Sequence, residues 1–168
     1  MSDRKLSFQT LKDNDFDFVY EVYFDETVNP FLTYDQMSKS EFQEVFKDLK
    51  SRHHSFLLLV DSVPCGFITV IANKGRSAHT AMIATYGIRK DFQGKGLGKK
   101  FLKKLIDDLK HEGFLRIQLT VEADNDRAIK LYQSLGFEVE GRMKNWFKRA
   151  SENEYKDELM MAICFPVN

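Results

Sequence analysis

The sequence is poor in the residues and segments that cross-link or anchor a chain. It contains only two cysteines, Cys65 and Cys164, among 168 residues, and their spacing fits no metal site. Each lies in an apolar, strand-like stretch, so we expect two buried thiols and no disulfide. No apolar run approaches membrane-spanning length, and the first residues lead into no signal-like segment. These absences predict a cytoplasmic protein that has no structural metal and no membrane span.

The chain also lacks a net charge. Its 25 basic residues balance its 25 acidic ones, so no overall field attracts nucleic acid or a membrane surface. Apolar and charged fractions of 43% and 30% are typical of a soluble globular protein. No repeat, low-complexity segment or linker divides the sequence, and its length is sufficient for one hydrophobic core. We therefore expect a single domain over residues 1–168.

Hydrophobic periodicity predicts a mixture of strands and helices. The expected strands cover 5–10, 55–60, 65–71, 78–88, 114–121, 137–148 and 155–165. The expected helices cover about 13–24, 35–50, 97–112 and 125–135. This order is neither a strict alternation nor a segregation of strands from helices. It predicts an α/β protein whose mixed sheet carries helices on both faces.

The most informative stretch runs from Tyr86 to Lys99, where a strand ends, a glycine-rich turn follows and a helix begins. Gly94, Gly96 and Gly98 allow the backbone to approach a ligand closely. The first N–H groups of the helix lack intrahelical acceptors and carry the positive end of its dipole, which suits a phosphate or pyrophosphate. The spacing fits neither a Walker A loop nor a dinucleotide fingerprint. A tight connection that binds nothing is the alternative.

Two motifs resemble one family. Residues 93–98 read Gln-Gly-Lys-Gly-Leu-Gly, which is similar to the coenzyme A pyrophosphate loop of the GCN5-related N-acetyltransferases, the GNAT superfamily. Residues 125–137 resemble its Asn-x-x-Ala-x-x-Leu-Tyr-x-x-x-Gly-Phe segment. Taken alone, Asn125 is an ordinary helix cap and Tyr132 a packing residue. Both motifs occur in the family's order, and the order of strands and helices also matches the family's fold, so the resemblance covers nearly the whole chain. It implies a single-domain α/β (α+β) GNAT fold with a central mixed, mostly antiparallel sheet and helices on both faces.

The resemblance also implies an acetyl-CoA-dependent N-acetyltransferase with no metal. It places Tyr132 near the thioester sulfur, where a phenol can donate a proton to the leaving thiolate. The cofactor-binding residues that it implies are Tyr86, Gly87 and Ile88 for the acetyl and pantetheine groups, Gln93, Gly94, Lys95, Gly96, Leu97, Gly98 and Lys99 for the pyrophosphate, and Asn125.

The general base stays open, because Thr120 stands where relatives that acetylate protein N-termini often carry a glutamate. The alternatives are a water relay or one of four side chains, Glu122, Glu26, Asp25 and His79.

The acceptor is expected to be a small molecule with a primary amine. The chain resembles bacterial L-amino acid N-acyltransferases and, more broadly, enzymes that acetylate ribosomal proteins or polyamines. Zero net charge and four aromatic residues near the expected cleft favour an apolar amino acid over a polycation. These aromatic residues are Phe24, Phe31, Tyr34 and Trp146, and the candidate partners for an acceptor carboxylate are Arg76, Arg89 and Arg142.

Two function classes compete with this reading. A non-catalytic sensor or interaction domain that binds CoA would also keep the glycine loop, although it has no need of Tyr132. A Rossmann-type nucleotide-binding protein would show another glycine rhythm. A homodimer is possible.

Overall fold

The computed structural model describes residues 4–167 of the chain. Within this range the protein has seven strands and four α-helices, and every strand and helix expected from the sequence is present. In chain order they are β1 (Leu6–Thr10), α1 (Phe16–Tyr23), α2 (Lys39–Ser51), β2 (His54–Val60), β3 (Val63–Ala72), β4 (Thr80–Ile88), α3 (Leu97–His111), β5 (Arg116–Glu122), α4 (Asp126–Gln133), β6 (Glu138–Phe147) and β7 (Lys156–Cys164).

The strands form one mixed sheet in the order β1-β2-β3-β4-β5-β7-β6. The pairs β1–β2, β2–β3, β5–β7 and β6–β7 are antiparallel, whereas β4 and β5 are parallel. The expected α/β fold with a mixed, mostly antiparallel sheet is confirmed. The chain divides into two compact units, one of residues 1–71 and 84–101 and the other of 72–83 and 102–168. The single domain over 1–168 stays a prediction, and the ends of that range lie outside the described residues.

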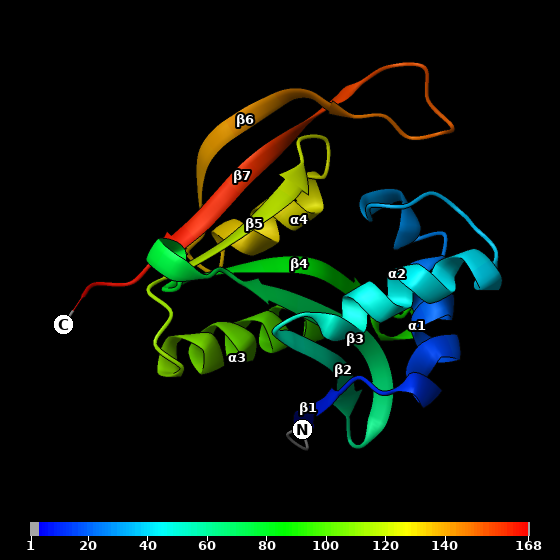
Figure 1. Cartoon of the computed structure of the whole chain (residues 1–168), viewed down its shortest axis with the longest axis horizontal. Helices are drawn as coiled ribbons and strands as arrows, with labels where there is room; N and C mark the ends of the chain where they lie inside the picture. The colour runs from blue at the N-terminus through cyan, green and yellow to red at the C-terminus, as the bar shows by residue number, and fades with distance from the viewer. Residues whose placement is uncertain (1–3, 168) are drawn as a thin grey trace. The chain divides into compact units, whose positions relative to one another are not determined.

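The first unit contains the antiparallel strands β1, β2 and β3 and the beginning of the glycine loop's helix (Figure 1). The β2–β3 hairpin turns at Asp61 and Ser62, whose φ angles are 50° and 70°. Two successive positive φ angles define the tight turn whose twist matches that of the flanking strands. The turn therefore takes two residues instead of the expected four, and β3 begins at Val63.

Two helices of this unit supply its aromatic core. Ser38 caps α2, because its hydroxyl accepts from the Glu41 N–H and the Glu41 carboxylate accepts from the Ser38 N–H at 2.8 Å. The helix α1 begins at Phe16, later than expected, because residues 13–15 form a 3₁₀ turn. Buried side chains of α1, α2, the hairpin and the residues that flank β1 and α1 form one cluster, which consists of Leu11, Val19, Val22, Tyr23, Phe24, Phe42, Phe46, Leu49, Leu57, Leu59 and Phe67.

The second unit is organised by β5 and the long, curved β6–β7 hairpin (Figure 1). The pairing of β5 with β4 joins residues 80–82 to residues 116–118. Strand β6 is an edge strand with two irregularities in its register, one between Val139 and Gly141 and one between Met143 and Phe147. At the second, three residues of β6 lie opposite Asp157 alone, so the strand bulges outward there.

The two cysteines differ, contrary to expectation. Cys65 is buried and its thiol is free, and burial raises its pKa to about 11. Cys164 is also a free thiol but is exposed, which corrects the expectation of two buried thiols. The reason is its place at the last residue of β7 opposite Arg116, whose guanidinium donates to the sulfur at 3.6 Å.

Residues 4–167 contain no helix that is both long enough and apolar enough to cross a membrane.

Candidate cofactor and catalytic site

The glycine loop has the backbone geometry of an anion site. Gly94 and Gly96 have φ angles of 72° and 71°, a region that favours glycine. A Cβ on either residue would meet no atom within 4 Å, so the loop presents bare backbone to open space. The first helical bond of α3 runs from the Lys100 N–H to the Gly96 carbonyl. Within residues 4–167, no backbone acceptor is recorded for the N–H groups of residues 94–96, which leaves them available to an anion.

The end of β4 leads into this loop and is held in place by close packing. A Cβ on Gly66 of β3 would lie 2.3 Å from the carbonyl oxygen of Gly87, so only glycine permits these strands to approach. The Tyr86 hydroxyl donates to the Gly98 carbonyl at 3.0 Å. A Cβ on Gly98 would lie 3.0 Å from that hydroxyl. The Tyr86 phenol therefore holds the loop in place through this hydrogen bond. The backbone of Gly87 and Ile88 leads toward the loop.

The polar side chains of the loop are turned back onto the chain. The Gln93 amide donates to the Ile88 carbonyl at 2.8 Å and to the Thr27 hydroxyl at 2.9 Å. The Lys95 ammonium donates to the Asp91 carbonyl at 2.6 Å. Lys99 is exposed on the first turn of α3. The anion would thus be held mainly by backbone N–H groups, with Lys99 as a neighbouring cation.

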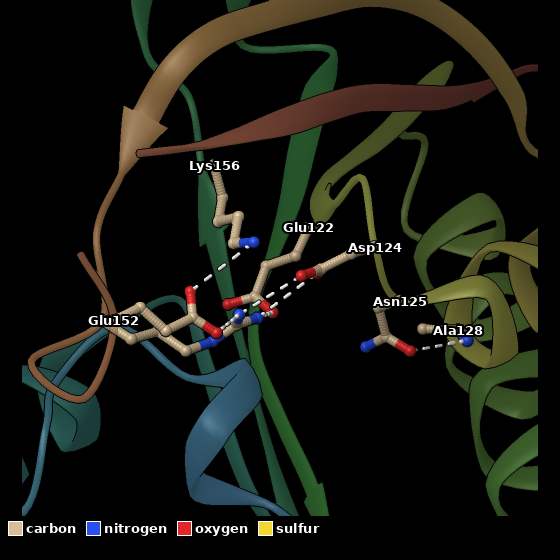
Figure 2. A network of polar contacts seen from close by, with 7 residues as sticks. Glu122, Asp124, Asn125, Ala128, Glu152 and Lys156 are labelled. Carbon is tan, nitrogen blue, oxygen red and sulfur yellow. Dashed lines mark hydrogen bonds and ion pairs between the residues drawn. The ribbon is translucent and has the colours of Figure 1, made fainter. Parts of the chain in front are cut away.

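The second motif builds the start of α4. Asn125 caps the helix, because its side-chain oxygen accepts from the Ala128 N–H at 3.1 Å. Its own N–H donates to the Glu122 carbonyl at 2.9 Å, which closes the turn between β5 and α4. Figure 2 shows the amide nitrogen of Asn125 on the side away from Ala128. The ordinary capping role is therefore present, and the amide nitrogen is the group through which Asn125 would contact a ligand.

Tyr132 lies near the end of α4. Its ring meets Phe137 edge-on with centroids 5.9 Å apart, and the Phe137 N–H donates to the Tyr132 carbonyl at 3.1 Å. Burial raises the pKa of its phenol to about 12. Within residues 4–167, no hydrogen-bond partner of the hydroxyl is recorded, which leaves the proton for a ligand. Asn125 and Tyr132 belong to the second unit, whereas residues 86–99 belong to the first.

A partly buried ionic network lies at the end of β5 (Figure 2). The Arg149 guanidinium pairs with three carboxylates, those of Glu122, Asp124 and Glu152. Lys156 lies 3.9 Å from Glu152. Burial raises the pKa of Glu122 to about 7, and the nearby charge of Asp124 also favours its neutral form. Arg149 opposes this shift but divides its charge among three anions, so we consider the upward direction the correct one.

Glu122 is the buried member of the four candidate bases. Asp25 accepts two hydrogen bonds from Thr27, and Glu26 forms an exposed ion pair with Lys90 at 2.6 Å. His79 is exposed. Arg149 was not anticipated from the sequence, because a lone arginine in a polar turn gives no sign of the three acids that it contacts.

Some of the residues expected to surround the acceptor contact other residues of the protein. Phe24 is a core residue, whereas Phe31, Tyr34 and Trp146 are exposed. Three arginines were proposed to bind the carboxylate of an acceptor. Two of them already pair with a carboxylate of the protein itself. Arg89 pairs with Asp91 and Arg142 with Asp157, whereas Arg76 is exposed.

Residues 16–137 match the family described as Acetyltransferase (GNAT) family. This chain belongs to the GNAT family. The matched range contains the glycine loop, Asn125, Tyr132 and Glu122, whereas Arg149, Glu152 and Lys156 follow it in the sequence. Coenzyme A fits this chain, because a pyrophosphate needs the bare backbone that Gly94 and Gly96 present.

Named relatives match a part of the chain. The chain is 37% identical over 83 residues to the ribosomal protein bS18-alanine N-acetyltransferase of Salmonella typhimurium, which is 49% of this chain and 55% of that protein. It is 43% identical over 86 residues to the mycothiol acetyltransferase of Renibacterium salmoninarum, which is 49% of this chain and 25% of that protein. The match thus spans about half the length of the first relative and a quarter of the second.

Solved GNAT structures resemble nearly the whole chain. The spermidine N-acetyltransferase from Vibrio cholerae, in complex with CoA and spermine, has a TM-score of 0.81 at 20% identity, covering 95% of both chains. The ribosomal-protein-S18-alanine N-acetyltransferase from Escherichia coli has a TM-score of 0.77 at 22% identity, covering 98% of this chain and 96% of that one. At these identities the similarity shows the fold.

Proposed function

We propose that this protein transfers the acetyl group of acetyl-CoA to the primary amine of a small acceptor. The observation that carries this proposal is the open backbone of the glycine loop at Gly94 and Gly96. Membership of the GNAT family supports the same cosubstrate. Acetyl-CoA supplies an activated acyl group as a thioester, and the backbone N–H groups of residues 94–99 would bind its pyrophosphate.

In this proposal Tyr132 serves the leaving group. A new bond joins the acceptor nitrogen to the acetyl carbon, the carbon–sulfur bond breaks, and the sulfur keeps the electron pair. The raised pKa keeps the Tyr132 phenol protonated at neutral pH. A phenol with a pKa near 12 is a weaker acid than an ordinary thiol, so its main contribution is a hydrogen bond to the developing thiolate. The thiol proton can then come from the phenol or from water.

The amine must lose a proton, and Glu122 is our preferred base. Its pKa of about 7 lies near the operating pH, which is the range in which a carboxylate accepts protons effectively. Water would relay the proton if the acceptor does not reach this carboxylate.

The acceptor that we propose is a small α-amine next to an apolar side chain, such as a free amino acid. The exposed aromatic residues Phe31 and Tyr34 support an apolar neighbour to the amine. Arg89 and Arg142 already hold carboxylates, so Arg76 remains the candidate partner of an acceptor carboxylate, and the proposal does not depend on one. A peptide N-terminus is the second candidate, favoured by the 37% identity to an enzyme named for a ribosomal-protein alanine.

The test is a thiol-release assay with acetyl-CoA and four amines, namely phenylalanine, phenylalaninamide, a peptide with N-terminal alanine, and spermidine. Exposed Cys164 contributes a fixed background of thiol, so release must exceed the protein concentration. Acetylated product is confirmed by mass spectrometry. Binding of CoA without release for any amine would instead favour a non-catalytic sensor.

A further inference from the structure

Gln93 connects the glycine loop to a distant segment of the first unit. Both recorded donations of its side-chain amide go to the chain, one to the Ile88 carbonyl and one to the Thr27 hydroxyl. Thr27 precedes Gln93 by 66 positions and belongs to the segment that follows α1. The side-chain amide of Gln93, the first residue of the loop motif, therefore bonds a neighbouring segment.

The hydrogen bonds continue from Thr27 into that segment. Its hydroxyl and its N–H both donate to one carboxylate oxygen of Asp25. The Asp25 carbonyl in turn accepts from the N–H groups of Val28 at 3.0 Å and Asn29 at 2.8 Å. The Asn29 amide then donates to the Tyr34 carbonyl at 2.9 Å. An unbroken chain of polar contacts thus runs from the loop to residues 25–34, which we call the α1–α2 segment.

A second contact, which is an exposed ion pair, joins the same two regions. Lys90 and Glu26 form an ion pair whose side chains are 60% and 78% exposed. An exposed ion pair of this kind contributes little, because water and salt screen it. The Gln93–Thr27 bond is partly buried, so its loss leaves polar groups that water replaces poorly. The ion pair therefore provides a matched control for the hydrogen-bond chain.

We infer that Thr27 and Gln93 are positioning residues that couple the conformation of the cofactor loop to that of the α1–α2 segment. This inference rests on the proposed function, since it assigns CoA to the loop. The α1–α2 segment carries exposed Phe31 and Tyr34, the residues that we propose to meet the acceptor. Binding at the loop would stabilise the arrangement of this segment, and by linkage the arranged segment would strengthen binding at the loop.

The first experiment needs no ligand. Urea unfolding is measured for Thr27→Val, which removes the hydroxyl at nearly constant volume, for Gln93→Met, and for the double variant. If the two side chains act through one another, the double variant should have the same urea midpoint of unfolding as the less stable of the two single variants. Independent, additive shifts would show that there is no coupling and would overturn the inference.

The second experiment measures CoA affinity by calorimetry. Thr27→Val should weaken CoA binding roughly 2- to 10-fold, the range expected for one net hydrogen bond, although Thr27 lies outside the loop. Thr27→Ser keeps the hydroxyl and should retain the affinity of the parent protein. Lys90→Gln removes the exposed ion pair and should also bind CoA normally. Hydrogen exchange in the α1–α2 segment should slow on addition of CoA in the parent protein and not in Thr27→Val.

The outcomes separate the two proposals. If the parent protein does not bind CoA, the proposed function fails and the coupling to a cofactor falls with it. If the parent protein binds CoA but Thr27→Val binds equally well, the coupling is wrong while the proposed function stands. A similar loss in Lys90→Gln would assign the effect to general loosening of the segment and would also reject the coupling.

Discussion

At the scale of single residues, one arginine is shared among several carboxylates. Arg149 is 14% exposed at its side chain and faces Glu122, Asp124 and Glu152, so one cation must serve three anions. Glu158 lies directly opposite Glu122 in the β5–β7 register and adds to the negative potential. Burial is the main reason that the pKa of Glu122 is raised to about 7; the charges of Asp124 and Glu158 add to it, and Arg149 opposes it.

The first prediction concerns stability against pH. The folded-state pKa of Glu122 lies above its ordinary value of 4.5, so its contribution is fully present below pH 4.5 and is lost as pH rises through about 7. The free energy of unfolding should fall between pH 5 and 8 by at most about 3 kcal/mol from this group. Glu122→Gln should flatten that decline, as measured by urea unfolding at several pH values.

Asp124→Asn is the control for this effect. Arg149 lowers the pKa of Asp124, so Asp124 titrates below this pH range and its removal should leave most of the decline in place. If the parent protein and Glu122→Gln have parallel profiles between pH 5 and 8, the raised pKa of Glu122 is wrong.

The second prediction concerns Tyr132. Replacing it by phenylalanine removes the hydroxyl but keeps the ring and its contact with Phe137. Turnover should fall roughly 10²- to 10³-fold, the range typical of a lost hydrogen-bond donor to the transition state, while CoA affinity changes little. Steady-state thiol release and calorimetry measure the two quantities. Turnover close to that of the parent protein would leave Tyr132 with a packing role only.

Residue roles were only partly readable from the sequence. The cap at Asn125 follows from its position before an amphipathic segment, and the structure confirms it. Contact of Gln93 with the cofactor stays a prediction, and the bonds of its amide to Thr27 and Ile88 were not anticipated. Periodicity detects contacts three or four residues apart, so it cannot reveal a partner 66 positions away.

At the scale of elements, the glycine loop joins a fixed strand to a helix through two positive φ angles. The third prediction changes one of them. Gly96→Glu places bulk and an anion where the phosphate is expected, and the fold should survive because the space around Gly96 is open. CoA should raise the melting temperature of the parent protein in proportion to the logarithm of its concentration, and this shift should vanish in the variant.

Gly75→Glu is a close match for this test. Gly75 has a φ angle of 62° and open space around it, but it lies outside the loop. Both variants therefore carry similar backbone strain and the same added charge. Gly75→Glu should keep the CoA shift. An undiminished shift in Gly96→Glu would remove the loop from the site.

Strand and helix positions were predictable because each element has a clear apolar pattern. What the pattern missed are features set by pairing between strands. The bulges of β6 depend on which residue of β7 lies opposite, and the exposure of Cys164 depends on Arg116 of the neighbouring strand. The late start of α1 has a local cause, because the Asp15 carboxylate accepts from the Lys12 N–H and stabilises a 3₁₀ turn.

At the scale of the whole molecule, the absence of a net charge bears on the acceptor. A polycation gains no long-range attraction from a protein with 25 positive and 25 negative side chains. The fourth prediction is that phenylalanine and phenylalaninamide are acetylated at similar rates and both faster than spermidine. Parallel progress curves at equal amine concentrations measure this. A strong preference for the free acid would require an arginine without a carboxylate partner, which makes Arg76→Gln the variant to examine next.

The GNAT family was predictable from two short motifs, and the strand order agrees with it. The acceptor was not predictable, because its determinants are side chains that the motifs leave free to vary. Phe24 illustrates the difficulty: it was expected near the cleft, and its ring contacts are with Tyr23 and Phe42 in the core. Sequence alone cannot distinguish an aromatic residue that contacts a ligand from one that contacts its neighbours.

The outward bulge of β6 has a consequence for association. A regular edge strand offers unpaired N–H and C=O groups to a strand of another molecule, which promotes aggregation. Here Asn145 at the bulge has a φ angle of 51°, and its N–H is already bonded to Asp157. Charged side chains at Glu138, Arg142 and Lys144 further oppose a neighbour. Edge-to-edge growth of the sheet is thereby discouraged at β6, and a homodimer, which stays a prediction, would need a different surface.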